Sequence, residues 1–163
     1  MKKALVVWTL ALVVVALNGA AQAQSAAQKE SAHVSDQEKL IGAWHLVSMG
    51  ELGANEKNGG LDADIQGSLI YTRDGHMSVQ LMYPRSQASL SNDYVLNGYE
   101  ASFGSYEVNE ETHTVTHHVQ GSITRGLVGK SLPRAYQFSN GKLILRPARP
   151  DEHWSVIWEH DGR

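Results

Sequence analysis

The sequence contains no cysteine, and its 163 residues include only four prolines and two phenylalanines. Without cysteine the chain can form neither a disulfide bond nor a thiolate metal site, so an ordinary hydrophobic core must stabilise it. Long apolar runs are also scarce. Ala4–Leu17 is the longest, and it is too short for a membrane span. Neither a disulfide-stapled fold nor a membrane-spanning one is therefore expected.

Residues 1–23 have the layout of a secretory signal peptide. A basic start, Met1-Lys2-Lys3, precedes the apolar run, and the segment ends in Ala21-Gln22-Ala23, which has the Ala-x-Ala form of a cleavage site. Cleavage after Ala23 predicts a periplasmic or secreted protein with no membrane span left. The alternative is an uncleaved anchor.

Negative charge exceeds positive charge in the mature chain. The whole sequence has 14 basic and 17 acidic residues, and the predicted signal peptide removes Lys2 and Lys3. The mature charge is then about −5 with histidine neutral, which disfavours nucleic acid as a partner. About 140 residues remain, which is enough for one hydrophobic core. The pattern predicts a flexible leader over residues 24–37 and one domain over residues 38–163.

The domain contains about eight short runs with strand-like alternation and one short helical start. Ser35-x-x-Glu38 has the spacing of a capping box, which predicts a helical turn running into the first strand. The expected strands cover residues 42–49, 68–72, 76–83, 103–108, 114–122, 134–138, 142–146 and 153–159. Hairpin signals lie between several of them, notably Asp74-Gly75 and Asn140-Gly141.

Three longer loops interrupt this pattern. Glu51–Asp64 is rich in glycine and asparagine, Pro84–Glu100 has the character of a long excursion or lid over one end, and Thr124–Pro133 contains glycine. Eight antiparallel strands without a βαβ pattern predict an all-β fold, an eight-stranded up-and-down barrel that can hold one small ligand. A β-sandwich is the alternative.

Several motifs resemble the bacterial and fungal lipocalin-like domain family. They are Leu40-Ile41-Gly42-Ala43-Trp44, the block Leu69–Gln80 with Asp74-Gly75-His76-Met77-Ser78, and Gly104-x-Tyr106-Glu107-Val108 followed by Thr114–Val119. The resemblance extends from about Leu40 to Trp158. It implies a calycin-type barrel with a ligand cavity, and it suggests catalysis for some fungal relatives.

The segment Phe103–Ser122 carries three of the eight histidines. On a helix His113 and His117 would share a face and could bind zinc. The β-branched residues around them favour a strand, however, where these two lie about 13 Å apart. The adjacent His117 and His118 would face opposite sides of the strand. We therefore predict no metal site and no cofactor.

His117 is the best candidate for a group inside the barrel. It shares a face with Val115 and Val119, and Tyr106 is expected to lie near it across the hairpin. A histidine in a partly dry cavity can transfer a proton near neutral pH, with a tyrosine or arginine assisting. His117 and Tyr106 are therefore the catalytic candidates if the protein is an enzyme.

Further residues could contact a ligand. Tyr71 and Arg134 could donate hydrogen bonds to it or cap the barrel. The resemblance implies the second role, because in calycin barrels a basic residue often packs over the first-strand tryptophan, here Trp44. His76 belongs either to the surface beside its turn or to a polar row that lines the cavity. His118 becomes a candidate if the two faces of its strand are reversed. These residues and Trp44 complete the predicted binding set.

The row Trp154, Val156 and Trp158 is expected to form barrel core, with a ligand wall as the alternative. Two functions follow from the sequence. The first is binding of a small, mainly apolar ligand. The second is a cofactor-independent isomerase, cyclase or lyase on the same barrel, with His117 as the acid or base and Tyr106 or Arg134 assisting.

Overall fold

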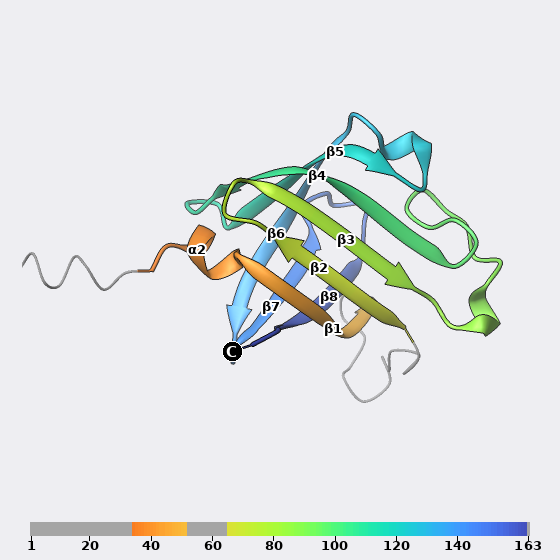
Figure 1. The fold of residues 1–163 in the computed structure, drawn as a ribbon, viewed down its shortest axis with the longest axis horizontal. Coiled ribbons are helices and arrows are strands. Elements are labelled where there is room, and N and C mark those ends of the chain that lie inside the picture. The colour runs from red at the N-terminus through yellow and green to blue at the C-terminus, as the bar shows by residue number, and fades with distance from the viewer. Residues whose placement is uncertain (1–33, 52–64, 163) are drawn as a thin grey trace, which may run out of the picture. The chain divides into compact units, whose positions relative to one another are not determined.

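The computed structural model describes residues 34–51 and 65–162, and they form a closed barrel of eight antiparallel strands in chain order (Figure 1). The strands are β1 (Gly42–Glu51), β2 (Gln66–Tyr71), β3 (His76–Met82), β4 (Tyr99–Asn109), β5 (Thr114–Ser122), β6 (Ser131–Ser139), β7 (Lys142–Pro147) and β8 (Trp154–His160). The predicted up-and-down barrel is confirmed, and pairing of β1 with β8 excludes the sandwich. The predicted signal peptide, most of the leader and most of the loop Glu51–Asp64 lie outside the described residues.

A short helix, α2 (Asp36–Leu40), precedes the barrel, as the capping-box spacing predicts. It stands at one end of the barrel, beside the β2–β3 and β4–β5 turns (Figure 1). These two turns and the β6–β7 turn lie where the sequence predicts them. Gly75 has φ of +84°, His113 +48° and Asn140 +50°, the left-handed conformations that tight hairpins need.

A β-bulge in β1 changes which of its side chains face inward. The register against β8 shifts between Leu46 and Ser48, so Trp44 and Leu46 face the interior before the bulge and Met49 faces it afterwards. Simple alternation would have put Ser48 inside. The bulge therefore supplies an apolar side chain at the far end of the strand.

Strand β6 begins at Ser131, three residues earlier than the sequence indicates. Leu132 pairs with His117 of β5, and Leu132, Arg134 and Tyr136 form the inward row of β6. The predicted loop Thr124–Pro133 is correspondingly shorter, and it contains a 3₁₀ turn, η2 (Arg125–Leu127).

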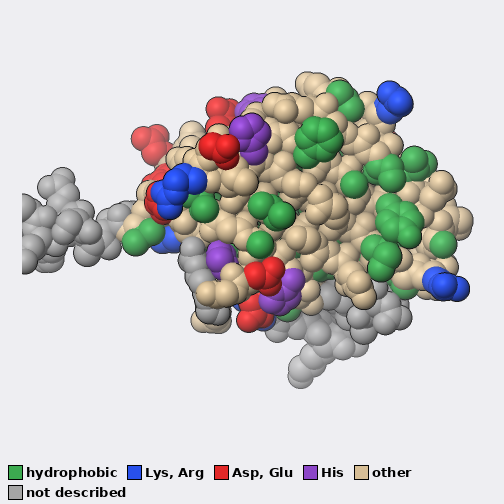
Figure 2. Space-filling view, in the orientation of Figure 1, with side chains coloured by type: hydrophobic (Ala, Val, Ile, Leu, Met, Phe, Trp, Pro, Cys, Tyr) green, Lys and Arg blue, Asp and Glu red, His purple; other side chains and the backbone are tan. Residues whose placement is uncertain are grey.

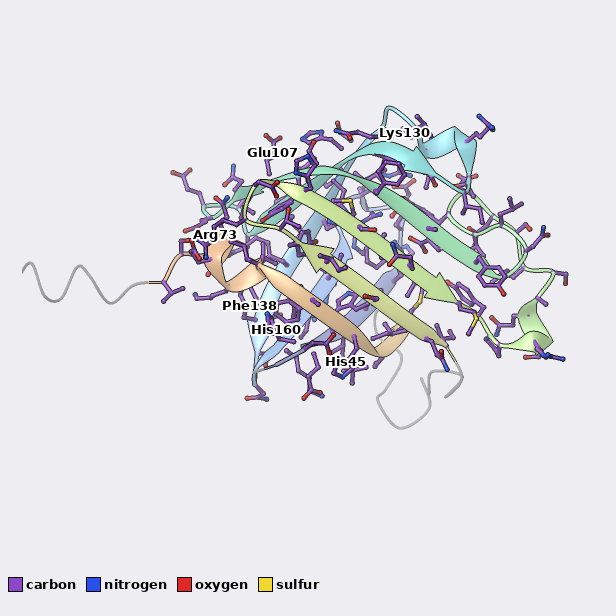
Figure 3. The ribbon with its side chains drawn as sticks, viewed as in Figure 1. His45, Arg73, Glu107, Lys130, Phe138 and His160 are labelled. Carbon is purple, nitrogen blue, oxygen red and sulfur yellow. The ribbon has the colours of Figure 1, made fainter. Side chains whose placement is uncertain are left out.

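The half of the barrel next to α2 is filled by aromatic side chains. Trp44 Nε1 donates a hydrogen bond to the Leu40 carbonyl at 2.8 Å, and Tyr136 Oη donates to Asp36 Oδ2 at 2.9 Å. His160, labelled in Figure 3 near Phe138, packs edge-on against Trp44 with the ring centroids 4.7 Å apart. We call this half the closed end.

The opposite half carries the long connection between β3 and β4. It contains the 3₁₀ turn η1 (Arg85–Gln87) and inserts Val95, which is only 2% exposed. Several apolar side chains remain exposed near this end, among them Met82, Leu96 and Tyr99. In Figure 2 apolar side chains gather on the end of the molecule away from α2. We call this half the open end.

Candidate functional site

A cavity of about 270 Å³ occupies the open end of the barrel. All eight strands contribute to its wall, and the β3–β4 connection adds Asn92, Tyr94 and Val95, while η2 adds Leu127. Asn92 fixes the local shape of the connection, because its Oδ1 accepts the backbone N–H groups of Tyr94 at 2.8 Å and Val95 at 2.9 Å. Such an asparagine-centred turn directs both side chains toward the cavity.

The floor of the cavity lies where the strands pass from the open to the closed end. On three strands one inward residue lines the cavity and the next inward residue, two positions along, belongs to the packed core: Leu69 and Tyr71, Val79 and Met77, Leu145 and Leu143. His117 and Arg134 line the cavity on β5 and β6, next to the packed Val115 and Tyr136. These residues mark the boundary between the hollow and the filled half.

His117 is hydrogen-bonded to Tyr71, which lies in this floor. Its Nε2 lies 2.6 Å from the hydroxyl of Tyr71, and both side chains are buried. Burial, followed by the charges of Arg134 and His118, lowers the pKa of His117 to about 3. Burial also raises the pKa of Tyr71 well above its ordinary value. At neutral pH the pair is therefore an uncharged imidazole and an uncharged phenol.

Arg134 brings a positive charge to the cavity wall. Its guanidinium carbon lies 4.7 Å from the ring centre of Trp154 and 5.4 Å from that of Tyr94, so cation–π contacts hold it to β8 and to the β3–β4 connection. Its Nη1 is 3.9 Å from Glu152 Oε2. Only 11% of the side chain is exposed.

Glu152 makes several contacts at the rim of the cavity. One of its oxygens accepts hydrogen bonds from Tyr94 Oη at 3.0 Å and lies 3.0 Å from Arg149 Nη2, and the other accepts from Trp154 Nε1 at 2.9 Å. The connection between β3 and β4 is thereby fastened to the one between β7 and β8.

Two inward residues of β4 add polar groups. Ser102 is 7% exposed, and Glu100 is partly buried. Burial raises the pKa of Glu100 to about 7, although the positive charge of Arg134 acts in the opposite direction. In the part of the chain that the structure describes, the cavity therefore combines a mainly apolar wall with one cation, Arg134, and one carboxyl group, Glu100, whose pKa is raised toward neutrality.

The structure brings together some of the sequence-predicted site residues and separates others. His117 and Arg134 both line the cavity. Tyr71 lies directly behind His117, in the floor. Tyr106 packs on Tyr71 with ring centres 4.7 Å apart and donates its hydroxyl hydrogen to the Thr72 carbonyl, so it belongs to the closed end together with Trp44.

The other two histidine candidates lie on the outer surface. His76 is exposed, with Nδ1 3.4 Å from Asp74 Oδ2. His118 lies on the outer face of β5, where Nδ1 is 2.8 Å from Ser131 Oγ and Nε2 is 3.2 Å from Glu107 Oε1. The strand faces are thus those predicted, with His117 inside, and the polar row of β3 faces outward.

The inward row of β8 serves two purposes. Val156 and Trp158 are buried in the core, as expected, and together with Trp154 they also line the cavity. Arg134 packs over Trp154 and Tyr94, not over Trp44. Glu100 was not among the sequence candidates, although its spacing of two from Ser102 would place both on the inward face once β4 is known to begin at Tyr99.

Among residues 34–51 and 65–162, no three histidine, aspartate or glutamate side chains are grouped closely enough to hold a metal ion. In the same ranges no helix has the length and apolar character needed to cross a membrane.

Comparison with known proteins identifies a family. A model described as "Lipocalin-like domain" matches residues 41–160. No curated protein matches the chain. Among solved structures, wild-type fluorescent protein UnaG is 12% identical to this chain with a TM-score of 0.39, and the alignment covers 76% of this chain and 98% of the UnaG chain. Lipoprotein YedD from Klebsiella pneumoniae is 13% identical with a TM-score of 0.37, and the alignment covers 74% of this chain and 73% of the YedD chain. Because the family match spans most of the barrel, this chain belongs to the lipocalin-like domain family.

Proposed function

We propose that this protein is exported and binds a small, mainly apolar ligand in the cavity of its barrel. The observation that supports the proposal is the contrast between the two halves of the barrel. Aromatic side chains fill the closed end, whereas the open end keeps a hollow of about 270 Å³ with largely apolar walls.

The apolar wall of this hollow favours an apolar occupant. The hollow opens at one end of the barrel, so water meets the wall in the free protein, and covering that apolar surface is favourable by about 25 cal/mol per Å². The volume of about 270 Å³ lies just below the usual range for ligand sites, which favours a small ligand.

Tryptophan fluorescence provides a direct binding assay, because Trp154 and Trp158 line the cavity. Titration with decanol, a small apolar probe, is expected to change the emission and to saturate. Val79→Phe places a larger side chain in the cavity and should weaken binding at least tenfold. The matched control is Gln80→Phe, on the outer face of the same strand, which should bind as the parent does. Equal binding by both variants would contradict the cavity as the site.

Export is tested on the protein expressed with its full N-terminus in a Gram-negative bacterium. We expect the mature protein in the periplasmic fraction, beginning at Gln24. Native mass spectrometry of that material would reveal any ligand acquired in the cell. A full-length chain recovered from the cytoplasm would contradict export.

A second candidate function is proton-transfer catalysis, as an isomerase, cyclase or lyase. The supporting observation is Glu100, a cavity carboxyl group whose pKa is raised to about 7 and is thus suited to exchange protons at neutral pH. His117, with its pKa lowered to about 3, is a weaker base. Incubating the native ligand with the protein in D₂O tests this function. Deuterium incorporation that disappears in Glu100→Gln supports catalysis, and none in the parent protein contradicts it.

A further inference from the structure

Among the described residues that line the cavity, Arg134 supplies a positive charge, and its nearest carboxylate already has other partners. Arg134 is largely buried, and Glu152 is 3.9 Å away, beyond hydrogen-bonding distance. Glu152 is instead in contact with Arg149, Tyr94 and Trp154. A guanidinium held in a largely apolar site is stabilised most by an anion in direct, bidentate contact.

Arg134 lines the cavity and is held there by its neighbours. Its guanidinium carbon lies over the rings of Tyr94 and Trp154. The N–H groups of a guanidinium can bind two oxygens of one carboxylate. The same two contacts restrict the side chain before any ligand arrives, which lowers the entropic cost of binding.

The charges of the other ionisable groups that line the cavity decide whether a charged ligand is favoured there. The ionisable side chains that line the cavity with Glu100 are Tyr83 just after β3, Tyr94 of the β3–β4 connection, His117 of β5 and Arg134 of β6. The two tyrosines have raised pKa values, and His117 is uncharged at neutral pH. Among the described lining residues, Arg134 is thus the charged group that acts on Glu100.

Resting on the proposed binding function, we propose that the ligand is an apolar molecule with a carboxylate head, that Arg134 binds this head, and that its binding is accompanied by uptake of one proton on Glu100. An ionised Glu100 would place two negative charges beside one positive charge in an apolar cavity, which is unfavourable. A protonated Glu100 removes this repulsion and can donate a hydrogen bond to the bound carboxylate.

Decanoate and decanol differ only in the head group and are therefore the probes. At pH 6 we expect the parent protein to bind decanoate at least tenfold more tightly than decanol. Arg134→Gln should lose this preference. Arg134→Lys, which retains the charge, should keep part of the preference, and Arg125→Gln, an exposed charge change on η2, should behave as the parent does.

Proton uptake is measured by calorimetric titration of decanoate in two buffers of different ionisation heat. We expect close to one proton per ligand at pH 8, few at pH 5.5 where Glu100 is already protonated, and none at either pH in Glu100→Gln. Equal affinity for decanoate and decanol, or a preference that survives in Arg134→Gln, overturns the head-group assignment and leaves apolar binding standing. Proton uptake unchanged in Glu100→Gln overturns the role of that residue. Absence of binding by both probes overturns the proposed function, and this inference with it.

Discussion

The free energy of unfolding of the ligand-free protein should depend on pH through Glu100. Burial raises the pKa of this carboxyl group from its usual 4.5 to about 7, so the folded state holds the proton more tightly than the unfolded state. The stability that this provides is fully present below pH 4.5 and is lost as the pH rises through 7. Glu100→Gln keeps the shape of the side chain and removes the titration.

The size of the effect follows from the two pKa values. Each tenfold difference in proton affinity corresponds to about 1.4 kcal/mol, so the ionised Glu100 costs the folded state about 3 kcal/mol. Water entering the cavity would reduce this figure. Relative to the parent, Glu100→Gln is therefore expected to gain about 2–3 kcal/mol of stability between pH 4.5 and pH 8.

Urea unfolding at several pH values in that range measures the gain. The control is Glu111→Gln, which changes an exposed acid in the turn between β4 and β5. Its difference from the parent should stay constant with pH. A Glu100→Gln difference that varies by less than about 0.5 kcal/mol over the range would show that Glu100 is solvated, and it would remove the electrostatic basis of the proton uptake proposed above.

Three further measurements address the floor of the cavity and the sheet. The pKa of His117 is lowered from 6.5 to about 3, so its contribution to stability is present above pH 6.5 and decreases below it. In urea unfolding, the parent should therefore lose about 2 kcal/mol more stability than His117→Gln between pH 6.5 and pH 4.5. Equal losses in the two proteins would contradict this. Tyr71→Phe removes the hydrogen bond to the buried imidazole and should lower the unfolding free energy by about 1–3 kcal/mol, whereas an unchanged thermal midpoint would mean that the bond contributes nothing. Gly104→Ala would place a Cβ 2.0 Å from the His118 carbonyl oxygen and should cost about 3 kcal/mol, while Gly126→Ala, which meets no atom within 4 Å, should change stability by less than about 1 kcal/mol; similar losses would contradict the tight approach of Gly104 to β5 beside its bulge.

The strand order and most turns could be predicted from sequence because their signals are local. Asp74-Gly75 and Asn140-Gly141 favour tight turns in almost any context, and alternation along Thr114–Ser122 places His117 inward once its neighbours Val115 and Val119 are seen to be apolar. The outward position of His118 follows from the same alternation.

The composition of the cavity could not be predicted in the same way, because it depends on register. Glu100 lies at the border of a polar connection, and only pairing with Leu81 makes it part of β4. The bulge after Leu46 reverses the alternation and brings Met49 inside, and nothing local in the sequence signals it. That Arg134 lies between Tyr94 and Trp154 results from three segments meeting in space.

The floor of the cavity also limits how much of a ligand the barrel can enclose. Beneath His117 lie Tyr71 and the packed aromatic core, so a bound chain cannot extend into the closed half. Affinity in a homologous series of probes should therefore rise with each added methylene only until the chain fills the hollow, and later carbons should contribute little. The extent of the packed half thus sets the longest chain that the barrel can enclose.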